Sequence, residues 1–334
     1  MSPEQALLAS DLPGGHARPI IRMAGIAGLG AALPERRVGN VEIAARLGVS
    51  VEWIERRTGI SERRHAAPGG RVSDLAASAG RMALEHAGLD PVELDMLLVA
   101  TLAADEITPG TAPIVANELG APNAAAFDVG AACTGSVAAL ALATASVQAG
   151  HAEHVLVVGA EILTRFLDLD DRRTVPLFGD AAGAIVVSVN ADGGIGPFVF
   201  GSDGARANAI RATRAAGVLE MDGHETFLQA VEHLSACTRQ VLERADLALD
   251  DIDLFVYHQA NSRILSSVAD RLELPRERVF DCIAELGNTS AASIPLALTE
   301  AVRAGALWPG ARVVIGAIGA GLVWGATVVT WGGA

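Results

Sequence analysis

Short apolar segments alternate with longer helical segments through most of the chain. The segments 97–100, 124–129 and 154–159 are apolar runs of the length expected for buried strands. The segments 111–119 and 136–148 lie between these runs and are long enough to form helices. Alternating strands and helices predict an α/β architecture with buried sheets.

The second half of the chain repeats this plan. The run from Asp95 to Ala100 resembles the run from Asp253 to His258. In each half a Phe-Asp pair, a turn of small residues and an alanine-rich helix follow, at 127–128, 132–135 and 137–148 and again at 280–281, 287–290 and 291–303. Cys133 lies 38 residues after Asp95, and Asn288 lies 35 residues after Asp253. The match indicates two copies of one β/α unit.

A pseudo-twofold pair of such units would bring matching strand ends to a shared centre. Cys133, His258 and Asn288 lie at strand ends of this kind, where open α/β sheets place their sites. The turn-rich stretch 189–204 divides the repeats, although it also fits an ordinary loop inside one fused pair. We predict an N-terminal extension at 1–18, an N-terminal half at 19–190 and a C-terminal half at 191–334.

Composition limits the class of protein. The 334 residues are 51% hydrophobic and include 36 glycines, with 4% aromatics, which suits closely packed α/β layers better than a β-sandwich. All 25 basic residues are arginine, and the net charge of −14 argues against general nucleic-acid binding, which needs a basic face. An anionic partner could still bind to a local patch of arginines.

Neither the N-terminal segment nor the cysteines indicate export. The segment 1–18 lacks a basic start followed by an apolar core, so we do not expect a signal peptide. The most hydrophobic window, 129–147, contains Cys, Thr, Ser and Gly, which favours a helix buried in a soluble core over a membrane span. Cys133, Cys237 and Cys282 are far apart, as expected for reduced thiols in a cytoplasmic protein without membrane association.

Cys133 lies where a predicted strand meets a predicted helix, in Gly130-Ala131-Ala132-Cys133-Thr134-Gly135. A helix start carries unpaired N–H groups and partial positive charge, which favour a thiolate and can hold an oxyanion. Free cysteines are also among the most buried residues and usually pack. This segment alone leaves both interpretations open.

Three further segments are ordinary when each is taken alone. His258 ends a predicted strand before the helix 262–272 and could be structural. The segment 287–293 reads as a helix N-cap, and 319–325 reads as a turn before the last strand. His151 and His154 are spaced for a metal site, but two ligands are too few, so we expect surface positions and no metal.

Taken together, these segments resemble the β-ketoacyl-acyl-carrier-protein synthase III family, a group of condensing enzymes in the thiolase superfamily. The resemblance runs from about residue 21 to the C-terminus. It includes the segments 52–60, 177–184 and 225–227 as well as those around Cys133, His258, Asn288 and Ala320. It implies a thiolase fold with two similar β/α halves related by pseudo-twofold symmetry in αβαβα layers.

The resemblance implies a role for each catalytic position. Cys133 would take an acyl group from a thioester. His258 and Asn288 would bind the malonyl thioester carbonyl and promote decarboxylation, since two fixed donors stabilise an enolate. The backbone N–H groups of Cys133 and Ala320 would form the oxyanion hole. No tightly bound cofactor is implied. The substrates would be acyl-CoA and malonyl-ACP or malonyl-CoA, with acyl carrier protein as a partner and a homodimer as the assembly.

The resemblance also implies substrate contacts. Residues that would contact coenzyme A or phosphopantetheine are Trp53, Arg57, Arg172, Asn261 and Arg263; surface charge and a packed indole are the alternatives. Thr108 occupies a position where many relatives have a bulky residue beside the primer pocket, which suggests room for a primer other than acetyl.

The chain departs from the family pattern at three further positions. Ala320 and Ala181 stand where glycines are usual, and Leu228 replaces a basic residue. Two other functions stay open: an acyltransferase that passes the acyl group to an alcohol or amine without condensation, and a degenerate structural subunit. The presence of Asn288 favours condensation, in fatty-acid initiation or in priming a polyketide or related metabolite. We expect Cys237 and Cys282 to pack.

Overall fold

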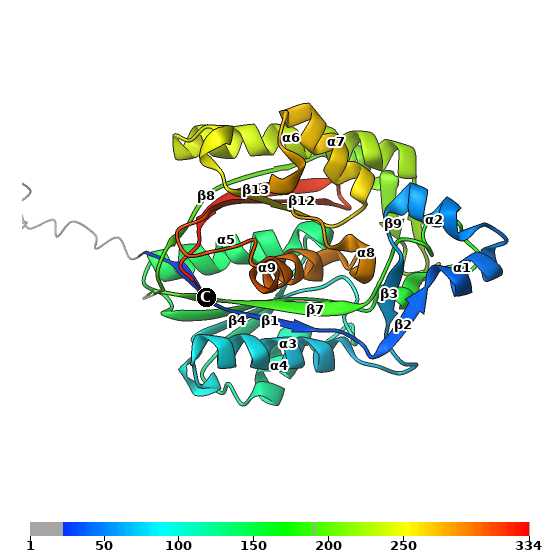
Figure 1. The fold of residues 1–334 in the computed structure, drawn as a ribbon. Helices are drawn as coiled ribbons and strands as arrows, with labels where there is room; N and C mark the ends of the chain where they lie inside the picture. Colours follow the sequence, from blue (N-terminus) through cyan, green and yellow to red (C-terminus); the bar gives the residue numbers. More distant parts are fainter. Residues whose placement is uncertain (1–22, 190, 334) are drawn as a thin grey trace, which may run out of the picture.

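Two β-sheets face each other across a central layer of helices (Figure 1). The computed structural model describes residues 23–189 and 191–333, so the predicted extension 1–18 lies outside the described residues. The first sheet has the strand order β1 (Gly25–Ala32), β7 (Ala181–Ser188), β6 (His154–Glu161), β4 (Met96–Ala100) and β5 (Ala125–Val129). The second has the order β11 (Leu254–Tyr257), β12 (Arg312–Gly319), β13 (Val323–Thr330) and β8 (Gly194–Ser202).

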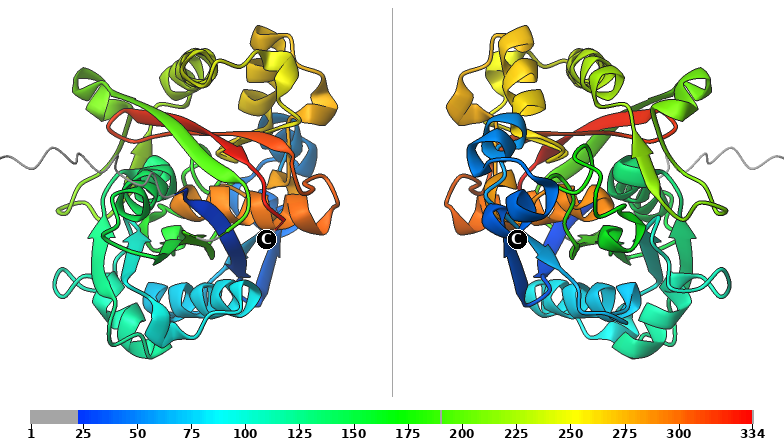
Figure 2. Two further views of the ribbon diagram at one scale, coloured as in Figure 1. Left: turned by 90° about the vertical axis from the view of Figure 1, so that its left-hand side faces the viewer. Right: turned by 90° about the vertical axis from the view of Figure 1, so that its right-hand side faces the viewer.

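Helices cover both faces of each sheet. Between the sheets lie α5 (Gly135–Gln148) and α9 (Ser293–Arg303), whose apolar side chains share one hydrophobic cluster with both sheets. The outer faces are covered by α3 (Val72–Ala87) and α4 (Thr111–Leu119) on the first sheet, and by α6 (Gly223–Ala245) and α7 (Ser262–Leu272) on the second. Figure 2 shows the same stack from two sides, with α6 and α7 in yellow and orange opposite α3 and α4 in cyan. The predicted αβαβα layering is confirmed.

The alanine-rich helix α5 is buried in the protein core, as its sequence predicts. Val137, Leu140, Ala143 and Val147 are buried, and alanines let the neighbouring sheets approach closely. Leu142, Ala145 and Gln148 are the exposed positions of this helix. Along residues 23–189 and 191–333, every helix is too short or too polar to cross a bilayer.

The two halves match in structure, but in a register that differs from the one expected. Short 3-10 turns precede the central helices at η3 (Ala132–Thr134) and η8 (Ser290–Ala292), and each begins with a non-glycine residue at positive φ, 46° at Ala132 and 49° at Ser290. These residues are 158 positions apart. The same separation joins Asp95 to Asp253, each of which bonds the backbone at the start of the neighbouring strand. Cys133 therefore corresponds to Ala291 and not to Asn288.

A smaller set of elements lies at one end of the stack of layers, on the right in Figure 1. They are β2 (Arg36–Gly39), α1 (Asn40–Leu47), α2 (Val51–Thr58), β3 (Glu62–His65), β9 (Ile210–Ala212), β10 (Leu219–Met221) and α8 (Ile283–Leu286). An apolar cluster that includes Ile43, Ile54 and Phe178 holds them to the rest of the protein. The predicted division at 190/191 falls between β7 and β8, and its two halves stay a prediction as domains.

Candidate active site

A cavity of about 720 Å³ opens where the two halves meet, and Cys133, His258, Asn288 and Ala320 all line it. The four residues come from four different segments: η3, the end of β11, the turn after α8 and the turn after β12. The structure thus brings together all the residues that sequence reasoning placed in the catalytic set.

Cys133 is held by the other half of the chain. A Cβ added to Gly319 would lie 2.8 Å from the Cys133 nitrogen and 3.0 Å from its Cβ, so β12 can approach η3 this closely because residue 319 is glycine. The hydroxyl of Thr134 donates to the Val323 carbonyl at 2.9 Å, which adds a second link between η3 and β13. These contacts fix the sulfur at the wall of the cavity.

The environment of the Cys133 thiol keeps it protonated at neutral pH. Burial raises its pKa to about 11, and the Glu161 charge adds to this rise. Hydrogen bonds from the Ser290 hydroxyl and from the N–H groups of Cys133 and Ala320 act in the opposite direction but do not outweigh burial. The N–H groups at the helix start therefore favour the thiolate as expected, but the loss of hydration is the larger effect.

His258 is a neutral imidazole at neutral pH. It is 2% exposed, and burial lowers its pKa to about 4. Its backbone N–H donates to the Gly316 carbonyl at 2.8 Å, which ties it to β12. Its Nδ1 atom is buried and has no hydrogen-bond partner among the described residues.

Asn288 is fixed in a buried turn. Its backbone N–H donates to the Leu177 carbonyl at 2.8 Å, and its carbonyl accepts from the Gly179 N–H at 3.0 Å. Its side-chain Oδ1 accepts from the Ser290 N–H at 3.0 Å. Since Oδ1 is engaged in this way, the Nδ2 amide is the part of the side chain left for a ligand.

The predicted substrate contacts divide into those at the cavity and one away from it. Trp53, Arg57, Arg172, Asn261 and Arg263 all line the same cavity as Cys133. Thr108 lies on an exposed loop and is not among the described residues that line either cavity.

Two of these residues also have structural contacts. The Arg57 guanidinium lies 4.6 Å from the centre of the Trp53 ring, one turn away on α2. Asn261 caps α7 through the Arg263 N–H and donates to the Arg57 carbonyl at 3.0 Å, so it joins α7 to α2. Asn261 therefore shapes the mouth of the cavity whether or not it contacts a ligand.

The cavity carries a strong excess of positive charge. Its lining includes five arginines and no Asp or Glu among the described residues: Arg57, Arg172, Arg173, Arg211 and Arg263. The chain as a whole has a net charge of −14. Two of the arginines are paired, Arg173 with Asp171 and Arg211 with Glu220. The arginines are thus concentrated at the place where a charged ligand would enter.

A second, more open cavity of about 550 Å³ adjoins the first. Leu102, Ala132, Ala320 and Leu322 line both cavities. Backbone and small side chains make up most of the second lining, including Gly130 and Gly321. Cys133 itself lines the large cavity, and its neighbour Ala132 lines both.

Sequence reasoning missed Ser290 and Glu161. Ser290 lines the large cavity, and its hydroxyl donates to Glu161 at 3.0 Å. Glu161 is fully buried at the end of β6, two residues beyond the predicted end of that strand. The signal that could have revealed Glu161 is an acidic residue at the end of a continuous apolar strand.

The other two cysteines pack in the core, and His151 is exposed, as expected. Cys237 is buried and Cys282 is partly buried. His154 is only partly exposed, contrary to the expected surface position, because it begins β6 and its Nδ1 lies 2.9 Å from the Ser188 hydroxyl. Across the described part of the chain, no three His, Cys, Asp or Glu side chains are grouped to hold a metal.

Comparison with known proteins agrees with the geometry. The family 3-oxoacyl-[acyl-carrier-protein (ACP)] synthase III matches residues 127–204, and its C-terminal counterpart matches residues 242–331. The chain is 43% identical over 323 residues to β-ketoacyl-[acyl-carrier-protein] synthase III 3 of Streptomyces coelicolor, which covers 92% of this chain and 96% of that protein.

Solved structures give the same result. The 3-oxoacyl-[acyl-carrier-protein] synthase III of Aquifex aeolicus matches with a TM-score of 0.90 and 39% identity over 92% of this chain and 100% of that one. The priming β-ketosynthase of the R1128 polyketide pathway matches with a TM-score of 0.90 and 39% identity over 96% and 99%.

The fold and these matches define a thiolase-fold condensing enzyme that transfers acyl groups. Within that class, the chain belongs to the β-ketoacyl-[acyl-carrier-protein] synthase III family.

Proposed function

We propose that the enzyme transfers an acyl group from acyl-CoA to Cys133 and condenses it with a malonyl thioester. One observation carries this proposal: Cys133 and Ala320, whose N–H groups lower the pKa of the Cys133 thiol, line the same cavity as His258 and Asn288. The reacting sulfur, two oxyanion donors and two carbonyl donors would then surround one reaction centre.

In the first half-reaction the Cys133 sulfur attacks the thioester carbonyl of the acyl donor. The carbonyl oxygen becomes negative, and the N–H groups of Cys133 and Ala320 stabilise it without reorganising. The carbon–sulfur bond to the donor breaks, and the released thiolate takes a proton from solvent. The covalent acyl-enzyme divides one difficult reaction into two easier ones.

In the second half-reaction His258 and the Asn288 amide donate hydrogen bonds to the malonyl thioester carbonyl. These donors stabilise the enolate that forms when the malonyl carbon–carbon bond breaks and CO2 leaves. The enolate carbon attacks the acyl carbonyl on Cys133, and the Cys133 sulfur departs and regains its proton. A neutral His258 suits this role, because its N–H donor is retained across the neutral pH range.

The arginines of the large cavity support a coenzyme A or phosphopantetheine donor. Guanidinium groups bind phosphates through paired hydrogen bonds, and the Trp53 ring offers a surface for an adenine. Arg57 and Arg263 line the cavity and have no carboxylate partner among residues 23–189 and 191–333. The same cationic mouth would receive the phosphopantetheine arm of an acyl carrier protein.

A homodimer is supported by the first sheet, which ends at the edge strand β5. The Phe127 side chain on β5 is 45% exposed, and Leu142 on α5 is 47% exposed. An exposed edge strand with apolar side chains favours pairing with a second copy of the chain. Thr108, which lies away from both cavities of its own chain, would contact the primer only across such an interface.

The second cavity bears on the size of the acyl primer. It is lined mostly by small residues, including Ala132 next to Cys133, which favours room for an acyl group larger than acetyl. Fatty-acid initiation and polyketide priming both fit this site. Simple transfer to an alcohol or amine remains the alternative, and the well-fixed Asn288 amide favours condensation over it.

The proposal is tested with purified protein and a panel of acyl-CoAs. Intact-protein mass spectrometry should show one acyl group added to the wild type and none to Cys133→Ala. Malonyl-ACP should then release CO2 and yield a β-ketoacyl product. Protein that neither acylates at Cys133 nor releases CO2 with any primer contradicts the proposal, and an intact malonyl group in the product would favour the acyltransferase.

A further inference from the structure

Glu161 is a fully buried carboxyl group that the reaction described above does not use. One oxygen, Oε2, accepts from the Leu102 N–H at 3.1 Å and the Thr101 hydroxyl at 3.2 Å, and the other, Oε1, accepts from the Ser290 hydroxyl at 3.0 Å. Glu161 forms no ion pair within residues 23–189 and 191–333. A buried carboxyl without a cation is costly when charged, so its presence beside the nucleophile needs an explanation.

Ser290 connects this carboxyl to the reaction centre. Its hydroxyl donates to Glu161 Oε1, and Ser290 lines the same cavity as Cys133 and lowers the pKa of the Cys133 thiol. The backbone at Ser290 has φ of 49°, a conformation that non-glycine residues rarely adopt, at the first residue of η8. The hydroxyl that binds Glu161 thus comes from a residue with an unusual backbone conformation, which lines the same cavity as Cys133.

The charges of Glu161 and Cys133 oppose each other. Burial raises the pKa of Glu161 to about 7, although hydrogen bonds from Leu102, Ser290, Thr101 and Ala291 act against the rise. Negative charge on Glu161 in turn raises the pKa of Cys133. Two negative charges in one buried site are unfavourable, so the two groups titrate as a coupled pair.

The other titratable groups around this pair face elsewhere or are neutral. His258, at the end of β11, lines the same cavity as Cys133 and is uncharged above about pH 4. Asp180, before β7, directs its carboxylate to the Thr164 hydroxyl and N–H and the Ala66 N–H. Asp105, on the loop after β4, binds the start of α3 and Arg165.

We propose that Glu161 is a positioning residue that accepts the Cys133 proton through the Ser290 hydroxyl, so that the pair holds a single negative charge. The Cys133 S–H bond breaks and its proton moves to Ser290 Oγ, while the Ser290 hydroxyl proton moves to Glu161 Oε1. The electron pair stays on sulfur and attacks the acyl thioester. After condensation the departing Cys133 sulfur takes the proton back along the same route. This assignment rests on the proposed role of Cys133 as nucleophile.

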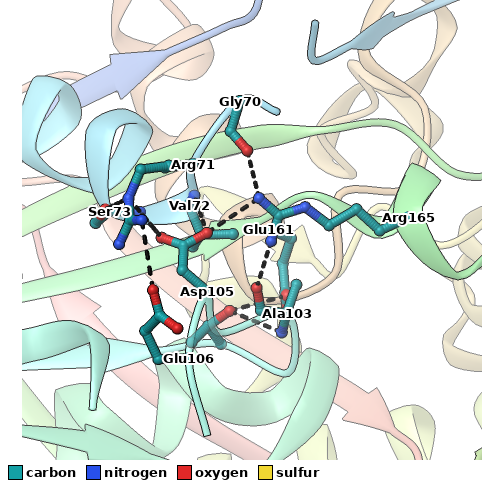
Figure 3. Close-up of polar contacts among 10 residues, drawn as sticks. Gly70, Arg71, Val72, Ser73, Ala103, Asp105, Glu106, Glu161 and Arg165 are labelled. Carbon is teal, nitrogen blue, oxygen red and sulfur yellow. Dashed lines mark hydrogen bonds and ion pairs between the residues drawn. The ribbon is translucent and has the colours of Figure 1, made fainter. Parts of the chain in front are cut away.

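Glu161 also holds the loop that follows β4. Figure 3 shows Glu161 beside Ala103, with Asp105 farther along the loop between Arg71 and Arg165. The loop is therefore held at two points, by Glu161 at Thr101 and Leu102 and by Arg165 at Ala103 and Asp105. Asp105→Asn is a matched control, because it disturbs the same loop without changing the charge that faces the sulfur.

The test is the pH dependence of Cys133 alkylation by iodoacetamide, followed by peptide mass spectrometry so that Cys237 and Cys282 do not interfere. In the wild type the rate should rise up to about pH 7 and then stay level, because above that pH the sulfur loses its proton only by passing it to Glu161. In Glu161→Gln the level region should disappear, and the rate should rise about tenfold per pH unit toward pH 9. Asp105→Asn should keep the wild-type profile.

A level region that is absent in the wild type or retained in Glu161→Gln overturns the proposal. If Glu161→Gln does not fold, Ser290→Ala gives a second test. Its rate in the level region should fall about tenfold, because the sulfur loses a hydrogen-bond donor and its route to the carboxyl, and an unchanged rate counts against the proposal. Alkylation needs no acyl donor, so wild-type protein that reacts with iodoacetamide but with no acyl-CoA contradicts the proposed function and leaves this test valid.

Discussion

The backbone of Gly319 touches Cys133 across the boundary between the two halves of the chain. A Cβ at Gly319 would lie 2.8 Å from the Cys133 nitrogen, which is closer than real Cβ contacts allow. The next residue, Ala320, supplies a backbone N–H group that lowers the pKa of the Cys133 thiol. The nucleophile and its oxyanion donors thus depend on a glycine from the opposite half.

Gly319→Ala should displace Cys133 and weaken acylation. The added methyl group must push η3 away from β12, which we expect to cost about 1–3 kcal/mol of stability as an overpacked core position. The rate of acyl transfer to Cys133, measured by mass spectrometry, should fall at least tenfold. Ala320→Gly is the matched control, since it removes a methyl group and keeps both N–H donors. Equal acylation by the two variants would contradict this account of Gly319.

Asn288→Ala should separate the two half-reactions. It removes one donor to the enolate oxygen, and losing one such donor costs about 10²- to 10³-fold in rate. CO2 release from malonyl-ACP should fall by that factor, whereas acylation of Cys133 should change little. Asn261→Ala is the comparison at the mouth of the cavity, where we expect a higher KM with less change in kcat. Loss of acylation in Asn288→Ala would show that this residue acts before condensation.

Arg57→Ala should weaken binding of the acyl donor. The Arg57 side chain lines the cationic cavity and lies over Trp53, so its removal takes away a phosphate contact and uncovers the indole. We expect KM for acyl-CoA to rise roughly tenfold, with the rise smaller at high salt, because surface charges are screened. Arg303→Ala is the control, since Arg303 pairs with Glu300 outside the lining. A similar KM for the two variants would contradict a phosphate role.

Phe127→Glu should produce a monomer if β5 pairs with a second copy. The substitution places a charge on the exposed edge strand, where it would be buried without a partner in a dimer. Light scattering during gel filtration measures the molecular mass. Met82→Glu is the control, because Met82 is also an exposed apolar residue but lies on the outer helix α3. Wild-type protein that is already monomeric would contradict the homodimer.

Much of the fold could be predicted from the sequence, because its pattern of apolar segments is local information. The helices 111–119 and 262–272 match α4 and α7 in their bounds. The predicted register of the repeat was wrong. Aligning the two halves by their turns of small residues equates Cys133 with Asn288. Aligning them by the positive φ of Ala132 and Ser290 equates Cys133 with Ala291. Backbone conformation of this kind is not readable from residue types, because both residues have side chains.

The candidate site could be predicted as a set of residues but not as an electrostatic environment. Its members lie at strand ends that the topology brings together, and this depends on the pattern of strands. The raised pKa of Cys133 depends on burial and on Glu161, whose carboxyl accepts a hydrogen bond from Ser290, 129 residues away in sequence. Thr108 could not be placed from motif alone, because its loop lies away from the cavities of its own chain.

Glu161→Gln should change how the stability of the protein depends on pH. The pKa of Glu161 is about 7 in the folded protein, against 4.5 for an ordinary glutamate, so between these two pH values the folded state binds the proton more tightly than the unfolded state. Wild-type stability should therefore fall as pH rises from about 4.5 to 7, by up to about 3 kcal/mol, and the variant should lack this fall. His258 acts in the opposite direction, because its lowered pKa adds stability as pH rises from about 4 to 6.5. That contribution is the same in both proteins and cancels in their difference.

Urea unfolding at about pH 5 and pH 8 measures the difference in stability between Glu161→Gln and the wild type, which should grow in favour of the variant. The same difference for Asp105→Asn should stay constant over this range, because hydrogen bonds and Arg165 hold the pKa of Asp105 below its ordinary value despite its burial. A constant difference for Glu161→Gln would mean that Glu161 keeps an ordinary carboxyl pKa, and the coupled pair with Cys133 would lose its basis.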